Sequence, residues 1–150
     1  MKKIFAGMVV VFLIATTGCA KKEAAKPAPN LTRVASHEGA KVTILEPADG
    51  ASVTSPVTIK FGIEGAELAP AGVVKENSGH HHLLIDMETL PPLDQPLPFN
   101  EHVMHFGHAQ TQAVINLAPG PHTLQLILAA GNHIPHNPPV MSPKVNIVVK

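Results

Sequence analysis

The sequence contains only one cysteine, and it contains no tryptophan and no tyrosine among its 150 residues. A single cysteine excludes an intramolecular disulfide and a metal site built from several thiolates. Of the five phenylalanines, Phe5 and Phe12 lie in an apolar run close to the start of the chain. We therefore expect a core built mainly from Val, Ile and Leu and stabilised without covalent cross-links.

An excess of charge of one sign is also missing. Eleven Lys and Arg balance eleven Asp and Glu, and nine basic and eleven acidic residues follow Cys19, which leaves a net charge of −2 (9 minus 11) there. No basic patch stands out, so the sequence does not indicate nucleic-acid binding. Beyond the N-terminal run, no apolar stretch is long enough to span a membrane.

The first nineteen residues have the pattern of an export signal. Two lysines precede an uncharged apolar run over residues 4–15, and a small residue and a glycine then lead to Cys19. This order is typical of a secretory signal peptide. Its ending resembles the lipobox of bacterial lipoproteins, although Thr16 stands where that motif usually has leucine. We expect a signal peptide over residues 1–18 and a lipid on Cys19, with an ordinary signal peptide cut nearby as the alternative.

Residues 19–40 are rich in Ala, Lys and Pro and have little apolar patterning, which predicts a solvated tether. The expected location is the cell envelope, with the domain facing the periplasm and contacting the membrane through its lipid. Ala20 occupies the position where an aspartate often marks retention in the inner membrane, so we expect the outer membrane. A second envelope protein is a further candidate for a binding partner of the domain.

The remaining chain, residues 41–150, is expected to form one all-β domain. Short β-branched segments bounded by Pro or Gly predict strands over residues 42–45, 57–63, 83–85, 113–117, 123–128 and 145–149. This spacing is typical of an antiparallel immunoglobulin-like β-sandwich of about seven strands. Residues 89–98 contain four prolines and are expected to form an extended loop.

Ten histidines are the most unusual feature of the composition, and the first group is a run of three. If this segment is a strand, His80, His82 and Asp86 share one face and His81 lies on the other. Two histidines at i and i+2 of a strand are roughly 6.5–7 Å apart, so both imidazoles can converge on one ion. The arrangement resembles the paired strand ligands of cupins and carbonic anhydrases over three residues.

Two further groups contain candidate ligands. His133 and His136 lie in residues 131–139, where three prolines and a glycine predict a stiff loop that loses little entropy when it holds a ligand. The segment 102–108 places His105 between two other histidines, and Gly107 favours a loop there. Neighbouring methionines, at positions 87, 104 and 141, could serve a soft ion such as Cu(I). His122 follows a Pro-Gly-Pro turn and is expected to be structural, bonded to nearby backbone.

The segments GHHHLLID, HFGHAQT, LAPGPHTLQLILA and NHIPHNPPVMS resemble a bacterial envelope lipoprotein domain family of unknown function, over about residues 41–150. The resemblance implies no established activity. His102 and His108 lie outside the resembling positions. The positions that it marks are residues 80–82, His105, His122, His133, His136, Pro138, Pro139 and Met141.

Three hypotheses follow from the histidines. The first is a non-enzymatic module that binds copper, zinc or nickel through His80, His82, His133 and His136, with His105 or His81 as a further ligand, and that loses affinity below about pH 6. The second is a metal-dependent hydrolase or lyase with a base such as Glu101, Asp86 or Glu88, which no recognised catalytic motif supports. The third is a hydrogen-bonded histidine network without metal, in a structural or partner-binding domain.

Overall fold

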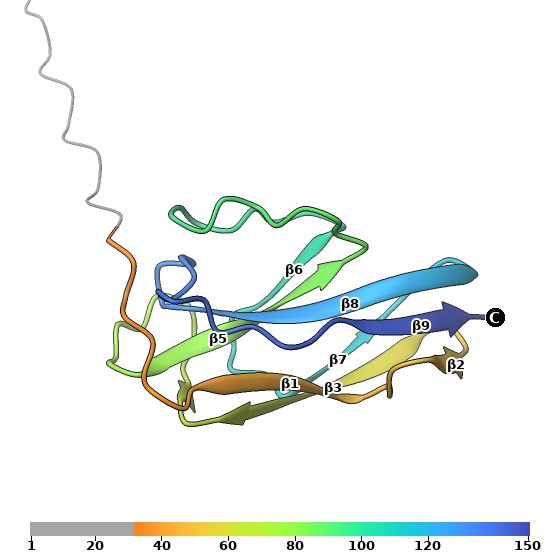
Figure 1. The fold of residues 1–150 in the computed structure, drawn as a ribbon, viewed down its shortest axis with the longest axis horizontal. Coiled ribbons are helices and arrows are strands. Elements are labelled where there is room, and N and C mark those ends of the chain that lie inside the picture. Colours follow the sequence, from red (N-terminus) through yellow and green to blue (C-terminus); the bar gives the residue numbers. More distant parts are fainter. Residues whose placement is uncertain (1–31) are drawn as a thin grey trace, which may run out of the picture.

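The computed structural model describes residues 32–150, so the expected signal peptide, Cys19 and the tether up to residue 31 lie outside the described residues. Within the described part, no helix is long and apolar enough to cross a membrane. Residues 32–150 form nine strands and no helix (Figure 1). The strands are β1 (Lys41–Glu46), β2 (Ala51–Val53), β3 (Val57–Glu64), β4 (Glu67–Leu68), β5 (Ser78–Ile85), β6 (Val103–Phe106), β7 (Gln112–Ile115), β8 (Gly120–Ala129) and β9 (Val145–Val149).

The strands form two sheets packed face to face. The smaller sheet has the order β1-β3-β7, and the larger has the order β2-β9-β8-β5-β4, with β6 also paired to β5. Most pairings are antiparallel, and β2–β9 and β4–β5 are parallel. The predicted all-β sandwich is confirmed. The described residues contain more strands than the expected seven because the short β2 and β4 and the unexpected β6 add to the predicted set.

The main core lies between the two sheets, where alternate side chains of each strand meet. Val57, Ile59 and Phe61 of β3 are buried, as their period-two spacing predicts. Leu124, Leu126 and Leu128 of β8 are buried in the same apolar cluster. Burial of each such side chain contributes roughly 1.5–3 kcal/mol, so the apolar core can stabilise the domain without a disulfide.

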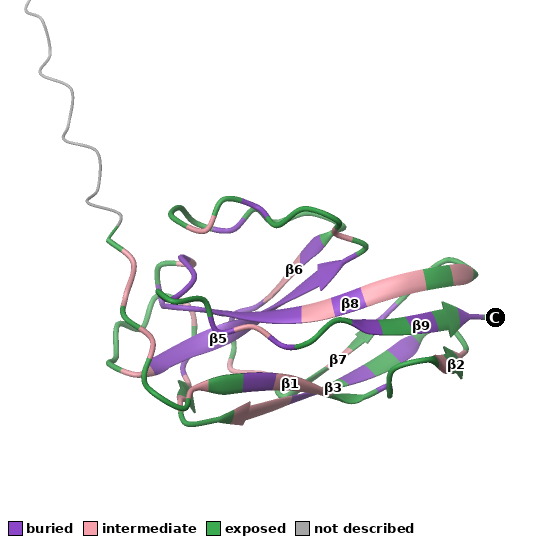
Figure 2. Ribbon diagram, viewed as in Figure 1, coloured by how far each residue is buried: buried purple, intermediate pink, exposed green. Residues whose placement is uncertain are grey.

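Strand β5 differs from the others because all eight of its residues are buried (Figure 2). It lies between β6 and β8, and both of its faces are covered. Leu83 and Ile85 belong to the main core, whereas Leu84 belongs to a second, smaller apolar cluster with Val103 and Leu97. Leu97 comes from the proline-rich connection between β5 and β6, which passes above the larger sheet in Figure 1. This connection therefore forms a partial third layer.

The prediction of a loop over residues 102–108 was wrong for its central part. Residues Val103–Phe106 form β6 and pair with β5 in the register His82↔His105 and Leu84↔Val103. The glycine at position 107 favoured a loop. The segment is too short for the alternation of its side chains to predict a strand by itself. Pairing with a buried central strand decides the conformation of such a short segment.

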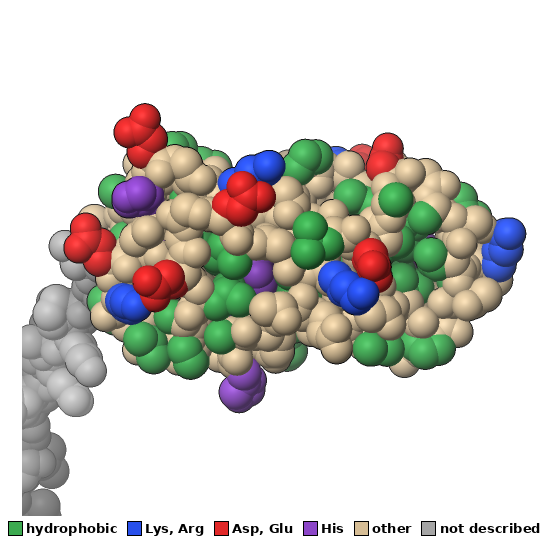
Figure 3. Space-filling view, turned by 90° about the horizontal axis from the view of Figure 1, so that it is seen from below, with side chains coloured by type: hydrophobic (Ala, Val, Ile, Leu, Met, Phe, Trp, Pro, Cys, Tyr) green, Lys and Arg blue, Asp and Glu red, His purple; other side chains and the backbone are tan. Residues whose placement is uncertain are grey.

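Charged side chains of both signs are interspersed on the face that Figure 3 shows. Two exposed ion pairs contribute to this mixture: Lys60 Nζ lies 3.0 Å from a Glu46 carboxylate oxygen, and Lys75 pairs with Glu67. Exposed pairs of this kind add at most about 1 kcal/mol each.

Candidate metal centre

Four histidines converge on the outer face of the larger sheet. His80 and His82 come from β5, His105 from β6, and His133 from the connection between β8 and β9. One ring nitrogen from each side chain can be chosen so that all four atoms lie within 4.8 Å of one another. We call these four side chains the histidine cluster. His80 and His82 are buried, and His105 and His133 are partly buried.

The strand register places three of the four rings. His80 and His82 point to the same side of β5 because side chains alternate along a strand. His105 lies directly opposite His82 across the β5–β6 pairing. The ring centroids of His80 and His82 are 4.9 Å apart, and each lies 4.9–5.0 Å from the His105 centroid.

The absence of a side chain at Gly107 leaves the space that the His105 ring occupies. A Cβ built at position 107 would lie 2.3 Å from Cε1 and 2.6 Å from Nε2 of the His105 imidazole. These separations are far shorter than a van der Waals contact, so any side chain at this position would force the ring to move. The glycine that favoured a loop in the sequence therefore has a different use, which is to admit one member of the cluster.

The fourth ring depends on a tight backbone turn. His133 adopts a positive φ of 65°, which is uncommon for a residue other than glycine. Its N–H donates to the Ala130 carbonyl at 2.8 Å, and its own carbonyl accepts the Leu97 N–H at 3.0 Å. The Asn132 side chain accepts the Ile134 N–H at 3.2 Å. Backbone held in this region by several bonds is common at functional sites.

The N-terminal arm, residues 32–37, holds the same loop from outside. The Arg33 guanidinium donates to the carbonyls of Pro135, at 3.1 Å, and of His136. The Asn137 N–H donates to the Val34 carbonyl, and the Ser36 N–H donates to the Asn137 carbonyl. In Figure 1 this arm descends beside the turn that follows β8. Residues within the expected tether are thus attached to the loop that carries His133.

The separation of two ring nitrogens suits a shared ion. His80 Nε2 lies 3.2 Å from His133 Nδ1. Metal–imidazole bonds of about 2.0–2.1 Å at tetrahedral angles place neighbouring nitrogens about 3.3 Å apart. The same distance also fits a hydrogen bond in which one nitrogen donates and the other accepts. The pair therefore fits both a metal centre and a histidine network.

Burial and mutual repulsion disfavour the charged forms of three members of the cluster, His80, His82 and His105. Burial, and then the neighbouring imidazoles, of which His105 contributes most, lower the pKa of His80 from 6.5 to about 4. Burial, and then His80 and the other nearby rings, lower the pKa of His82 to about 2. The pKa of His105 is lowered by the same two causes. Neutral imidazole is the form that binds metal, so His80 and His82 are available as ligands even at pH 5.

Three members of the cluster also carry a buried nitrogen that forms no hydrogen bond within the described part of the chain. These atoms are Nδ1 of His80, Nδ1 of His82 and Nε2 of His105. An unsatisfied buried polar atom costs about 1–3 kcal/mol, and such atoms are uncommon in native structures. A nitrogen that binds an ion needs no hydrogen-bond partner, so an ion bound to His82 Nδ1 and His105 Nε2 would remove this cost for those two atoms. An ion bound through His80 Nε2 would leave His80 Nδ1 unpartnered.

Two predicted ligands lie outside the cluster. His81 points into the main core, where its ring centroid is 5.1 Å from that of Phe61, and burial lowers its pKa to about 4. His136 is buried behind β5, and its Nδ1 is 3.4 Å from the Leu128 carbonyl oxygen. A Cβ at Gly79 would approach the His136 ring to 3.1 Å and the Ala129 carbonyl oxygen to 2.4 Å. His136 therefore contributes to the packing at the end of β5.

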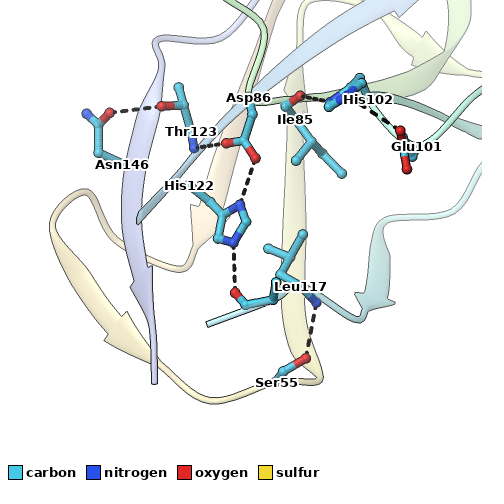
Figure 4. Close-up of polar contacts among 10 residues, drawn as sticks. Ser55, Ile85, Asp86, Glu101, His102, Leu117, His122, Thr123 and Asn146 are labelled. Atoms are coloured by element: carbon cyan, nitrogen blue, oxygen red, sulfur yellow. Dashed lines mark hydrogen bonds and ion pairs between the residues drawn. The ribbon is translucent and has the colours of Figure 1, made fainter. Parts of the chain in front are cut away.

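His122 forms hydrogen bonds to a carboxylate and to a backbone carbonyl (Figure 4). Its Nδ1 lies 2.7 Å from an Asp86 carboxylate oxygen, and its Nε2 lies 2.8 Å from the Ala118 carbonyl oxygen. Burial disfavours the charged ring, but the two hydrogen bonds and the Asp86 charge outweigh it and raise the pKa of His122. Asp86 also accepts the Thr123 N–H at 2.7 Å. It does not share the outer face with His80 and His82 because β5 ends at Ile85, and Asp86 has a positive φ of 54°.

The remaining candidates are separate from the cluster. His102 donates to the Ile85 carbonyl at 3.1 Å, also drawn in Figure 4, and His108 is exposed. Met104 packs against the main core, and Met87 and Met141 pack against the smaller apolar cluster. The carboxylates proposed as catalytic bases, Glu88 and Glu101, are exposed. Among the described residues, no carboxylate or cysteine joins the histidine cluster.

Sequence reasoning missed two contributors to this centre. The first is the proline-rich connection, whose residues 96–99 lie against the cluster. The second is the N-terminal arm. The high proline content of residues 89–98 was a usable signal, because a stiff connection that leaves a buried strand must cross one face of the sheet. The arm gives no comparable signal, because an Ala/Lys/Pro composition is also that of a solvated linker.

Comparisons with known proteins bear on the family of this chain. No curated protein and no solved structure matches it. A family model described as a domain of unknown function, DUF4399, matches residues 59–150, which is more than half of the chain. The matched range includes every member of the histidine cluster and His122. The sandwich with its histidine-bearing outer face therefore belongs to the DUF4399 family.

Proposed function

We propose that this domain is a non-enzymatic module that binds one transition-metal ion through His80, His82, His105 and His133. The observation that supports it most strongly is the convergence of four imidazoles from three separate segments, with one ring nitrogen of each within 4.8 Å of the others. Packing alone does not require the ring nitrogens of four histidines to lie close to one another, whereas a shared ion does. Relative to the sequence-based ligand set, His105 replaces His136.

The donor atoms restrict the class of ion. Four neutral imidazoles suit Cu(II), Zn(II) and Ni(II), whereas Mg(II) and Ca(II) require oxygen ligands. The three methionines named from the sequence, Met87, Met104 and Met141, pack against apolar clusters. Copper or zinc is therefore the proposed occupant, with nickel as the next choice.

A histidine network without metal is the main alternative. The contact of 3.2 Å between His80 Nε2 and His133 Nδ1 favours it, because this contact also fits a hydrogen bond. The unpartnered nitrogens of His80, His82 and His105 argue against it, since a network evolved for hydrogen bonding would satisfy its own members. We therefore favour the metal-binding module.

A hydrolase is less well supported by the geometry. A metal-bound water needs a nearby base, and Glu88 and Glu101 are exposed and do not join the cluster. Asp86 is already engaged with the Thr123 N–H and His122. The carboxylates named from the sequence are thus occupied elsewhere or turned toward solvent.

The proposed location is the bacterial envelope, with the protein anchored through a lipid on Cys19 and the domain in the periplasm. The support comes from the sequence pattern of residues 1–19. Labelled palmitate should be incorporated into the wild-type protein and not into Cys19→Ser. Equal labelling of the two would contradict the anchor without affecting the metal proposal.

The test of metal binding uses untagged protein, because a polyhistidine tag would itself bind the ion. After treatment with chelator and removal of the chelator, the protein is titrated with Zn(II), Cu(II) and Ni(II) while heat and bound metal are measured. We expect one equivalent to bind, and the His82→Gln variant to lose this binding. Weak uptake of several equivalents that is equal in both proteins would contradict the proposal.

A further inference from the structure

A small cavity lies directly beside the histidine cluster. Its volume is about 190 Å³, and its lining includes three members of the histidine cluster, His82, His105 and His133. Residues 96–99 of the proline-rich connection form the rest of the lining. His80 does not line this cavity and is fully buried. An ion held by the four rings would therefore have one side facing the cavity.

The chemistry of the cluster determines what this side would attract. All four donors are imidazoles, which bind a metal in their neutral form, and no carboxylate or cysteine of the described chain joins them. A divalent ion would keep its full double charge in a partly buried place, where electrostatic interactions are stronger than in water. An anionic ligand from solution would reduce this charge.

The part of the lining that the proline-rich connection contributes is apolar. Leu97 is buried, and prolines at positions 96 and 98 flank it. Phe99 is 79% exposed, and its ring stands edge-to-face with His105 at a centroid separation of 6.3 Å. An alkyl group that entered the cavity would meet these side chains.

The size of the cavity limits the ligand further. Sites for drug-sized molecules usually measure about 300–1,000 Å³, so this cavity admits a ligand of only a few non-hydrogen atoms. We propose that the cavity is the binding site for a small carboxylate, whose oxygen completes the coordination of the ion and whose short alkyl part lies against Leu97, Pro98 and Phe99. This inference rests on the proposed function, because the carboxylate binds through the metal.

The test uses the full-length protein loaded with one equivalent of Cu(II). Azide is the first probe, because its coordination to Cu(II) produces a charge-transfer absorption band. We expect this band to appear and to saturate at one azide per copper. Formate, acetate, propionate and butyrate are then added to displace azide, and their affinities are obtained from the loss of the band.

The carboxylate series tests whether the alkyl part of the ligand contacts the apolar lining of the cavity, or whether the carboxylate binds only through its oxygen to the ion. Each methylene that becomes buried against the apolar lining should tighten binding about two- to fourfold. The Phe99→Ala variant, loaded with one equivalent of copper, should reduce this gain per methylene. Val114→Ala is the matched control, because Val114 is an exposed apolar residue on β7 of the other sheet. It should behave as the wild type.

The possible outcomes distinguish this inference from the one on which it depends. If copper binds at one equivalent and azide produces no band, the ion is closed to solution ligands, and the cavity proposal fails while the metal proposal stands. If azide binds but the carboxylates do not displace it, or if they bind without any dependence on alkyl length, the proposed ligand class is wrong. If copper does not bind, both proposals fail together.

Discussion

The two faces of strand β5 carry the same residue type in different surroundings. His81 faces the core between the sheets and contacts the ring of Phe61. His80 and His82 face outward, toward His105 and His133. Both environments exclude water and lower the pKa of the histidines to about 4 or below.

The difference between the faces lies in the neighbours. On the inner face one imidazole is surrounded by apolar side chains and has no second histidine with which to share an ion. On the outer face each imidazole has three others within reach. Burial alone therefore does not indicate a metal site, whereas convergence of several buried donors does. The predictions below test this distinction, from the largest expected effect to the smallest.

The largest effect is expected from removal of one outer-face ring. His82→Gln keeps a similar side-chain volume but removes an imidazole from the buried centre of the cluster. Loss of a residue that only supports a ligand costs about 10–100-fold in metal affinity, so loss of the ligand should cost more than about a hundredfold. Metal titration followed by calorimetry measures it. A loss of less than tenfold would place the ion elsewhere.

Metal should stabilise the folded protein, because unfolding disperses the four ligands along the chain. At a free metal concentration of one hundred times Kd, binding adds about 2.7 kcal/mol to the free energy of unfolding. For a domain of this size the unfolding midpoint should then rise by about 10 °C or more. Differential scanning calorimetry with and without chelator checks this result, and the rise should be absent in His82→Gln.

Gly107→Ala should disturb the cluster without removing any ligand. The added Cβ would collide with the His105 ring, so the ring must turn away from its place. We expect metal affinity to fall about tenfold, which is the size of effect seen when a supporting contact is lost. Ala113→Gly, on β7 of the other sheet, is the control. Gly72→Ala cannot serve as one, because the positive φ of Gly72 would itself strain an alanine. Equal affinity in Gly107→Ala and wild type would show that His105 is not a ligand.

His122 should confer a pH dependence that is independent of metal. Its pKa is raised in the folded protein, so its contribution to stability is fully present below the unfolded value of about 6.5. This contribution is lost as the pH rises through the higher folded value. Urea unfolding at pH 5.5 and pH 8.5 should show that His122→Asn loses more stability at the lower pH. His37→Gln, at an exposed position of the arm, serves as the control.

The smallest effect on metal binding is expected from His81→Leu on the inner face. Metal affinity should stay within about twofold of the wild type, because His81 points away from the cluster. Stability at pH 8 should be unchanged or higher, since both ring nitrogens are buried without partners. Because burial lowers the pKa of His81, the wild type loses stability as the pH falls from 6.5 toward 4, and the variant should escape this part of the loss.

A tenfold loss of metal affinity in His81→Leu would contradict the separation of the two faces. So would a large loss of stability at pH 8, since the leucine side chain matches the apolar surroundings of the inner face. Measurement of both quantities on the same variant is needed, because a variant that fails to fold would also fail to bind metal.

Alternation along strands made part of this centre predictable. The sequence pattern predicts that His80 and His82 point to one side and His81 to the other, and the apolar periods of β3 and β8 predict the sandwich core. The type and position of most long strands follow from these local patterns.

The rest of the site depends on contacts that no local pattern contains. His105 joins the cluster because β6 pairs with β5, and that pairing is set by the tertiary arrangement of a four-residue strand. His133 and His136 are three residues apart in one stiff loop, yet only His133 reaches the cluster, because a positive φ turns it inward. Spacing alone could not choose between them.

X-ray absorption spectroscopy of the protein loaded with one equivalent of zinc or copper tests the central claim most directly, because it reports the type and number of atoms bound to the ion. We predict a first shell of nitrogen at about 2.0 Å, with outer-shell scattering from at least three imidazoles that decreases in His82→Gln and is unchanged in His81→Leu. A shell made mainly of water or carboxylate oxygen, or one that His82→Gln leaves unaltered, would contradict a metal centre built on the outer face of β5.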